Sequence, residues 1–401
     1  MSLLREAVRP RCMGRKICRL YRARQWQRPQ ERHLSRSAAA AAAPVTGAAE
    51  AEVESALRYC TDLLRKYDRP SYTLSTFIPR QTQPFYIALR ALNVSLSTIA
   101  DTTSSHTIGL MRLQFWRDTI TKTLAGSPPK EPVAILLSSA INDLHARTQG
   151  QGRARISKGW FLRMINAREQ SLTNAAFPTL AALESYAENT YSTLLYLTLS
   201  ALPMTSLTAD HLASHIGKAA GIAAVLRGLP LVAFPPPTTS QQAGQAAALG
   251  GAVTGGTKQG AIILPLDVMA QAGVKEEDVF RHGAEAPGLR DAVFAVATRA
   301  SDHLITGQQM LSNLRVGRDV GHEFEHEGEE GHEYGAPRGQ PYESQWEEVK
   351  RAFGVFMPAV STRLWLDKLE KVDFDIFQPE LLTSDWRLPW KAYLAFQRKS
   401  F

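Results

Sequence analysis

The chain has 401 residues, of which 44% are hydrophobic, enough to build a sizeable globular core. Its formal net charge of +8 would suit nucleic-acid binding, but the excess of positive charge lies at one end. Residues 1–44 carry eleven Lys and Arg against only Glu6 and Glu31, so the rest of the chain is close to neutral, which argues against a basic nucleic-acid-binding body.

The first 48 residues are predicted to be a mitochondrial transit peptide followed by a flexible lead-in. They are rich in arginine, poor in acidic residues and contain Ser and Ala, a composition typical of matrix import. A nucleic-acid-binding tail is the alternative interpretation of the same residues. Cys12 and Cys18 fall within this segment, so the mature chain would keep only Cys60 and could form no intramolecular disulfide.

From about residue 51 the apolar residues recur at three- and four-residue steps, which predicts an all-α body. The first helix passes through Leu57, Cys60 and Leu64 and is expected to end at Pro70. Further helices are predicted at about residues 83–99, from 108 to the turn at Gly126, and at 133–148, 157–173, 180–202, 209–229, 290–314 and 345–372. No uninterrupted apolar run reaches the ~18 residues of a transmembrane helix.

Two stretches inside the predicted body, which spans residues 49–380, lack this pattern. Residues 233–260 are rich in Pro, Gln and Gly, and residues 317–341 in Glu, His and Gly, so both are expected to be flexible loops. His322, His326 and His332 in the second stretch could bind zinc on a helix, but the surrounding glycines favour a solvated loop.

Residues 381–401 are predicted to form a basic, aromatic C-terminal tail. Trp386 and Trp390 are interleaved with Arg387 and Lys391, and Pro389 is placed to open a short helix. Basic and aromatic residues together suit a membrane interface or a groove on a partner protein. The alternative is a tail that packs back on the helical body.

Several segments resemble the squalene/phytoene synthase family: Phe85–Ala91, Arg112–Arg117, Gly217–Arg227 and the Leu264-Pro265 pair that follows. The resemblance spans most of residues 51–370 and implies a single isoprenoid-synthase-like helical bundle. It also implies the family's chemistry, the ionisation of prenyl diphosphates by magnesium ions. Such hard cations take carboxylate oxygen ligands.

The carboxylates needed for that chemistry are largely missing. By the resemblance, aspartates are expected at Ser97, Thr98 and Asp101 in a first motif and at Gly228 and Val232 in a second. Only Asp101 is present. Because one carboxylate cannot assemble a site for several magnesium ions, the chain is predicted to have no metal site, no cofactor and no catalytic residue.

Asp101 and Arg227 are the candidate residues of a vestigial binding pocket. Asp101 is either a remaining ligand or a solvent-facing residue at a helix end. Arg227 either holds a phosphate or lipid headgroup through its guanidinium fork or forms an ion pair inside the bundle, for example with Asp101. His211 and His215 share a helix face but lack the nearby glutamate of a zinc-hydrolase motif, which favours ordinary packing.

One branch of the family resembles the chain more closely, namely synthase-like assembly factors of mitochondrial respiratory complex I that have no established prenyl transferase activity. The segments that carry this resemblance are Thr107–Trp116, Ser185–Thr190, Leu194–Leu199 and Ala213–Ala219. The resemblance implies a non-catalytic factor on the matrix side of the inner membrane, attached peripherally. Its expected partners are complex I subunits or other assembly factors, and not nucleic acid.

Two other functions stay open on the sequence alone. One is a prenyl transferase with a rearranged metal site, for which Asp118, Glu184 and Glu188 are the nearest candidate carboxylates in the sequence. The other is a protein that binds a prenyl chain or lipid in the former substrate cavity.

Overall fold

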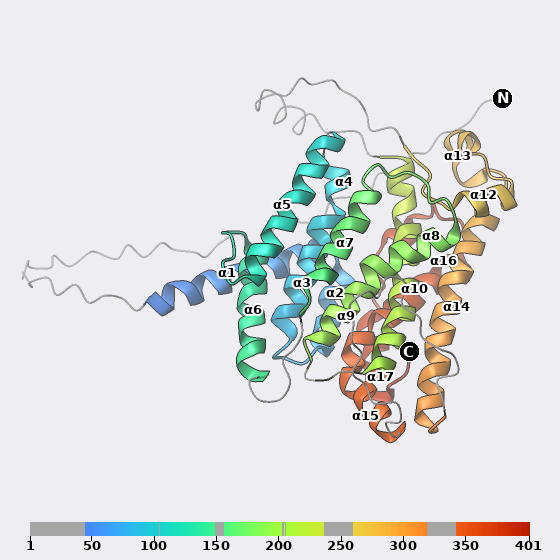
Figure 1. Ribbon diagram of the computed structural model, residues 1–401. Coiled ribbons are helices and arrows are strands. Elements are labelled where there is room, and N and C mark those ends of the chain that lie inside the picture. Colours follow the sequence, from blue (N-terminus) through green and yellow to red (C-terminus); the bar gives the residue numbers. More distant parts are fainter. Residues whose placement is uncertain are drawn as a thin grey trace, which may run out of the picture. The chain divides into compact units, whose positions relative to one another are not determined.

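The computed structural model describes residues 45–103, 105–148, 156–202, 204, 206–235, 260–318 and 342–401. Within these ranges every regular element is a helix (Figure 1), which confirms the predicted all-α class. The described residues from Thr46 onward form one compact unit. Residues 1–44 of the predicted transit peptide and lead-in, and most of the two predicted loops, lie outside the described residues, whereas residues 45–48 belong to the start of α1.

The helices in chain order are α1 (Val45–Tyr67), α2 (Arg69–Leu74), α3 (Gln83–Ser97), α4 (Ile99–Thr102), α5 (His106–Leu124), α6 (Pro132–Thr148), α7 (Lys158–Gln170), α8 (Leu180–Ala187), α9 (Thr193–Ser200), α10 (Leu207–Ala233), α12 (Leu266–Ala272), α13 (Glu276–His282), α14 (Leu289–Arg315), α15 (Tyr342–Ala352), α16 (Pro358–Lys371) and α17 (Leu388–Arg398). A π-helical turn over Glu188–Ser192 joins α8 to α9. Short polar residues begin several helices: Ser105, Thr179 and Ser206 each accept a backbone N–H from the first turn that follows.

Helix α10 is the central element of the bundle. It contacts α8, α9, α14, α16 and the π-turn, and Figure 1 shows α14 running alongside it. By length and composition α10 could also cross a membrane, but half of its most apolar stretch is buried inside the bundle. The core helix of a bundle, packed on several sides, is as apolar as a transmembrane helix, so the composition of α10 is explained by its place in the bundle.

The π-turn lies unusually close to α10, and glycines make this possible. A Cβ atom at Gly217 would lie 2.3 Å from Cα of Ser192, and one at Gly221 would lie 2.5 Å from Cβ of Ala187. At both positions α10 therefore meets the segment of α8 and the π-turn almost backbone to backbone.

Two of the predicted helices are interrupted. The helix expected over residues 180–202 is broken by the π-turn, and the one expected over 345–372 is broken by a 3-10 segment, Phe353–Phe356. The second break has a clear cause, since Pro358 opens α16 and Gly354 approaches the carbonyl oxygen of Phe77 so closely that a Cβ would lie 2.2 Å from it. Near Pro70 the prediction was close: α1 ends at Tyr67, and Pro70 lies in the first turn of α2.

Candidate functional site

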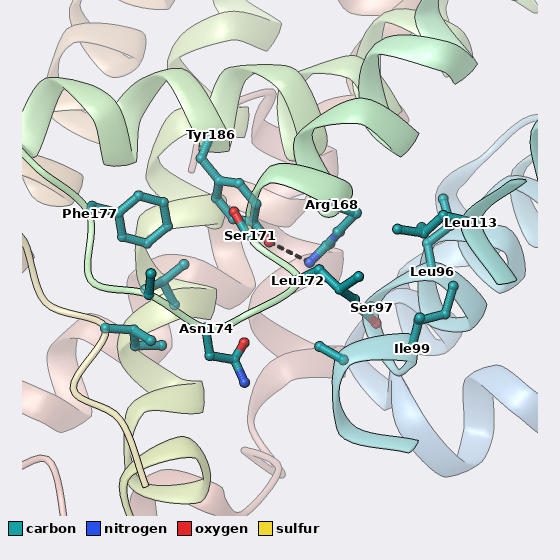
Figure 2. Close-up of a pocket in the computed structure, with 14 residues that line it drawn as sticks. Leu96, Ser97, Ile99, Leu113, Arg168, Ser171, Leu172, Asn174, Phe177 and Tyr186 are labelled. Carbon is teal, nitrogen blue, oxygen red and sulfur yellow. Dashed lines mark hydrogen bonds between the residues drawn. The ribbon is translucent and has the colours of Figure 1, made fainter. Parts of the chain in front are cut away.

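The end of α3 and the middle of α10 border one small pocket, shown in Figure 2. Its lining includes Ser97 from α3, Arg168 from α7, Tyr186 from α8 and Val225 from α10. The cavity has a volume of about 80 Å³. Pockets that bury small-molecule ligands are commonly ~300–1,000 Å³, so this space is small for a prenyl chain.

At the predicted first motif, where the resemblance led us to expect aspartates, the hydroxyl groups of Ser97 and Thr98 are bonded to their own helix. Oγ of Ser97 donates to the carbonyl of Val94 at 3.0 Å, and Oγ1 of Thr98 donates to the same carbonyl at 3.0 Å. Asp101 lies one turn further along, on the short helix α4, with an exposed side chain. Its charge is close enough to act on the guanidinium of Arg168.

At the second motif, neither side chain offers an oxygen ligand. Gly228 has open space where a side chain would begin, since a Cβ there would meet no atom within 4 Å, and Val232 is a half-buried hydrocarbon. These donors do not fit a magnesium cluster, which requires several carboxylates. In the described part of the chain no three His, Cys, Asp or Glu side chains gather closely enough to hold a metal ion.

Glu184, one candidate for a rearranged metal site, is engaged by basic side chains of α14. It accepts hydrogen bonds from Nε of Arg299 and, at 2.7 Å, from Nε2 of His303. Partial burial alone would raise the pKa of Glu184, but these hydrogen bonds outweigh it and lower the pKa to about 2. His303 also pairs with His215 through their Nδ1 atoms, 3.0 Å apart, so His215 belongs to this polar network.

The other two candidate carboxylates also have partners of their own. Glu188 is buried in the π-turn, where it accepts hydrogen bonds from the Tyr196 hydroxyl at 2.5 Å and the Ser214 hydroxyl at 2.8 Å. Asp118 lies on an exposed face of α5 and accepts a hydrogen bond from Gln114 at 2.9 Å. None of the three contributes to the pocket lined by Ser97 and Arg168.

Arg227 is one of three arginines whose Nε atoms are buried and whose guanidinium groups all lie near enough to Tyr191 to interact electrostatically with it. We call these three the guanidinium cluster; only Arg227 was a predicted site residue. The others are Arg90 on α3 and Arg168 on α7. Each guanidinium lies over an aromatic ring: Arg90 over Tyr86 at 5.4 Å, Arg168 over Tyr186 at 5.5 Å and Arg227 over Trp365 at 5.4 Å. A favourable interaction between a cation and a ring face thus takes the place of a salt bridge.

The guanidinium cluster is incompletely hydrogen-bonded. Arg168 donates to the Tyr186 hydroxyl at 2.5 Å and to Oδ1 of Asn93 at 3.0 Å. The Nε atoms of Arg90, Arg168 and Arg227 are all buried without a hydrogen-bond partner among the described residues. Burial lowers the pKa of Arg227, because low-dielectric surroundings disfavour its charge. One member of the cluster could have been suspected from the sequence. Arg90 interrupts an otherwise apolar helical stretch, and a charged residue in such a stretch is expected to be buried only where it has a partner.

A family model for squalene/phytoene synthase matches residues 64–232 and 252–393 of the chain. Among curated proteins, "NADH dehydrogenase (ubiquinone) complex I, assembly factor 6" of Rattus norvegicus is 33% identical over 408 residues, covering 100% of this chain and 99% of the relative. The Homo sapiens protein of the same name is 32% identical over 99% of this chain and 96% of the relative. The Drosophila melanogaster homologue is 28% identical over 84% of this chain and 83% of the relative.

Two solved structures of similar fold are synthases by name. A dehydrosqualene synthase in complex with ligand superimposes with a TM-score of 0.58 at 15% identity, covering 88% of this chain and 99% of that structure. The squalene synthase HpnC from Alicyclobacillus acidocaldarius gives a TM-score of 0.54 at 15% identity, covering 81% of this chain and 96% of that structure. At this level of identity the likeness shows a common fold.

Proposed function

The chain belongs to the squalene/phytoene synthase family, and we propose that within this family it is a catalytically silent factor that assists assembly of mitochondrial respiratory complex I. Relatives that carry the name of a complex I assembly factor match it over nearly its whole length. The predicted membership of this family is confirmed. The assembly role is inferred from the names of those relatives.

The proposed absence of catalysis is supported by the side chains at the positions where the family binds its metal ions. The hydroxyls of Ser97 and Thr98 bond to their own helix, and Gly228 and Val232 offer no oxygen ligand. The pocket between these segments instead contains the cationic side chain of Arg168 and has a volume of about 80 Å³. Fixed positive charge beside the pocket repels magnesium rather than binding it.

The proposal places the mature protein on the matrix side of the inner membrane, attached peripherally. Its partners are complex I subunits or other assembly factors. The arginine-rich composition of residues 1–44 supports import into the matrix, and the nearly neutral body supports contacts with proteins rather than nucleic acid.

Deletion of the gene tests the assembly role. Native-gel separation of respiratory complexes should show a loss of assembled complex I, and the parent chain should restore it. The variant Asp101→Asn should restore complex I equally well, because a single exposed carboxylate does no metal chemistry in this proposal. Normal complex I in the deletion strain would refute the assembly role.

A direct assay tests catalytic silence. Incubating the protein with farnesyl diphosphate or geranylgeranyl diphosphate and magnesium should release no pyrophosphate above the background of a heat-denatured sample. Pyrophosphate release that a chelator abolishes, and that Asp101→Asn lowers, would establish a prenyl transferase with a rearranged site.

A second candidate function is the binding of a phosphate-bearing lipid or prenyl phosphate at the guanidinium cluster. The three unpartnered Nε atoms favour it, since a guanidinium donates readily to phosphate oxygens. Extraction of the purified protein and mass spectrometry of the extract would detect such a ligand. Its absence, together with unchanged thermal stability in inorganic phosphate or diphosphate, would remove this function.

A further inference from the structure

Helix α17 is fixed to the body of the protein by one face. Leu388, Ala392 and Ala395 are buried on that face, which contacts α2 and α16. Phe396 packs on Phe77, with 5.2 Å between the ring centroids. The C-terminal segment is therefore a docked helix with a defined orientation, so its opposite face is a permanent part of the surface.

The opposite face of α17 and the turn before this helix present large apolar side chains to solvent. Trp386 is 79% exposed, Trp390 70%, Tyr393 52% and Leu394 45%. Tyr393 and Leu394 follow Trp390 by three and four residues, so these three side chains lie along one side of α17, and Trp386 lies in the turn that precedes the helix. We call this set the aromatic stripe. Contiguous exposed groups of this size mark a surface that is covered by a partner or a membrane.

The segment that carries the aromatic stripe has an excess of basic residues. Between Trp386 and Phe401 the chain has no acidic residue and four basic ones, Arg387, Lys391, Arg398 and Lys399. At the end of α17, Nη2 of Arg315 donates to the backbone carbonyls of Arg398 and Lys399 at 2.9 and 3.0 Å, which adds a fifth cation to this region. The nearest preceding acid, Asp385, is paired with Arg387 at 2.7 Å, so these two charges offset each other and Lys391, Arg398, Lys399 and Arg315 carry the excess.

An apolar groove opens beside the aromatic stripe. It has a volume of about 760 Å³ and lies between α1, α2, the start of α3 and α17. Trp390 and Tyr393 line it on the α17 side, facing Leu57, Phe77 and Ile87 from the other elements. Its volume is within the ~300–1,000 Å³ range of sites that bind small apolar ligands.

We propose that the aromatic stripe and the adjoining groove dock the protein on an anionic bilayer, with an acyl chain of a bilayer lipid entering the groove. Tryptophan and tyrosine favour the headgroup region of membranes, and neighbouring Lys and Arg side chains are attracted to anionic lipids. In the sequence Lys391 lies between Trp390 and Tyr393 of the stripe, whereas lysine is depleted from the cores of protein–protein interfaces. The identity of the membrane, the matrix face of the inner membrane, rests on the proposed function.

Quenching of tryptophan fluorescence tests the docking geometry. The full chain is mixed with phosphatidylcholine vesicles, with or without phosphatidylglycerol, whose acyl chains carry bromine as a quencher. The difference between the parent and Trp386→Phe/Trp390→Phe isolates the light from these two indoles. That difference signal should be quenched in the anionic vesicles. An unquenched difference signal in vesicles that bind the protein would overturn the proposal.

Vesicle affinity tests the energetics. Replacing the two indoles, Trp386→Ser/Trp390→Ser, should weaken binding by on the order of tenfold or more, because burying one large apolar side chain contributes about that factor. Lys391→Glu should weaken binding to anionic vesicles by about fivefold or more, and added salt should reduce this difference. These side chains are exposed, so melting temperatures should stay unchanged. The arginine-rich residues 1–44 are common to all variants.

The matched control is a second exposed apolar pair, on α5. Ile108 and Met111 are 41% and 68% exposed, and Ile108→Ser/Met111→Ser removes them in the same way. This pair should leave vesicle affinity unchanged. If it weakens binding as much as the loss of the two indoles, α17 is not the docking helix. If neither the quenching nor the vesicle affinity depends on Trp386, Trp390 and Lys391, the stripe is a protein-binding surface. Complex I assembly in cells is measured separately and still tests the proposed function.

Discussion

Two glycines on α10 give a matched test of how the bundle is packed. A Cβ atom at Gly217 would lie 2.3 Å from both Cα and Oγ of Ser192 and 2.5 Å from its backbone nitrogen, whereas a Cβ at Gly228 would meet no atom within 4 Å. Both residues are inside the same helix. Replacing each by alanine therefore adds the same methyl group in the same secondary structure, with contact at one site and open space at the other.

The expected changes in the free energy of unfolding have opposite signs. Alanine in place of glycine in a helix interior stabilises by ~0.5–1 kcal/mol, which is the whole expected effect of Gly228→Ala. At Gly217 the clash is with backbone, which cannot rotate away, so α10 and the π-turn must separate. Overpacking of this kind costs ~1–3 kcal/mol, which leaves Gly217→Ala destabilised by about 1–2 kcal/mol.

The Gly217 substitution should also disturb the candidate site. The π-turn carries Tyr191, whose ring lies 5.9 Å from the Arg168 guanidinium, and Ser192, whose hydroxyl donates to the carbonyl of Ser214 at 3.1 Å. Moving the turn changes both contacts. In cells, Gly217→Ala is therefore expected to lower the amount of complex I together with the stability of the protein, and Gly228→Ala to leave complex I unchanged.

Thermal unfolding followed by far-UV circular dichroism measures the pair. The unfolding entropy of a compact unit that spans Thr46–Phe401 is large, so a loss of 1–2 kcal/mol lowers Tm by only about 1–3 °C, and the gain at Gly228 raises Tm by a smaller amount. If the Gly217→Ala variant is as stable as the parent, α10 and the π-turn do not approach each other as closely as described. A destabilised Gly228→Ala variant would show that the second motif faces packed atoms rather than open space.

Two further predictions concern buried charges. Glu184→Gln should destabilise the protein by about 1–2 kcal/mol at pH 7 after allowance for solvent screening, because the lowered pKa of Glu184, about 2, makes its ion pairs stabilising above pH 4.5. This difference between parent and variant should shrink as the pH falls from 4.5 towards 2, and equal denaturation midpoints at pH 7 would contradict it. Arg227→Met should leave stability unchanged or raise it by about 1 kcal/mol, since the guanidinium has a buried, unpartnered Nε and a pKa lowered by burial. Arg168→Met, the comparison, removes hydrogen bonds to Tyr186 and Asn93 and should cost about 1–3 kcal/mol; a ranking of the two variants in the opposite order in urea denaturation would refute this assignment.

The sequence by itself determined the class of fold and most of its helices, and it led to the prediction that the family's carboxylate motifs are lost. Helical periodicity is a local property, so α3, α5 and α10 were predicted within a few residues of their observed ends. The replacement of carboxylates at Ser97, Thr98, Gly228 and Val232 follows from residue identity once the family is recognised. Neither inference needs to know what lies beside these residues in space.

Only the tertiary structure decided what surrounds the positions of the two predicted motifs. Arg90, Arg168 and Arg227 come from α3, α7 and α10, and their burial together with unpartnered Nε atoms results from contacts between segments far apart in the sequence. The approach of α10 to the π-turn depends in the same way on two distant backbones. The exposure of Trp386 and Trp390 could not be predicted either, because the buried face of α17 is chosen by its contacts with α2 and α16. Burial is a property of packing between elements, and periodicity within one element does not encode which neighbour covers it.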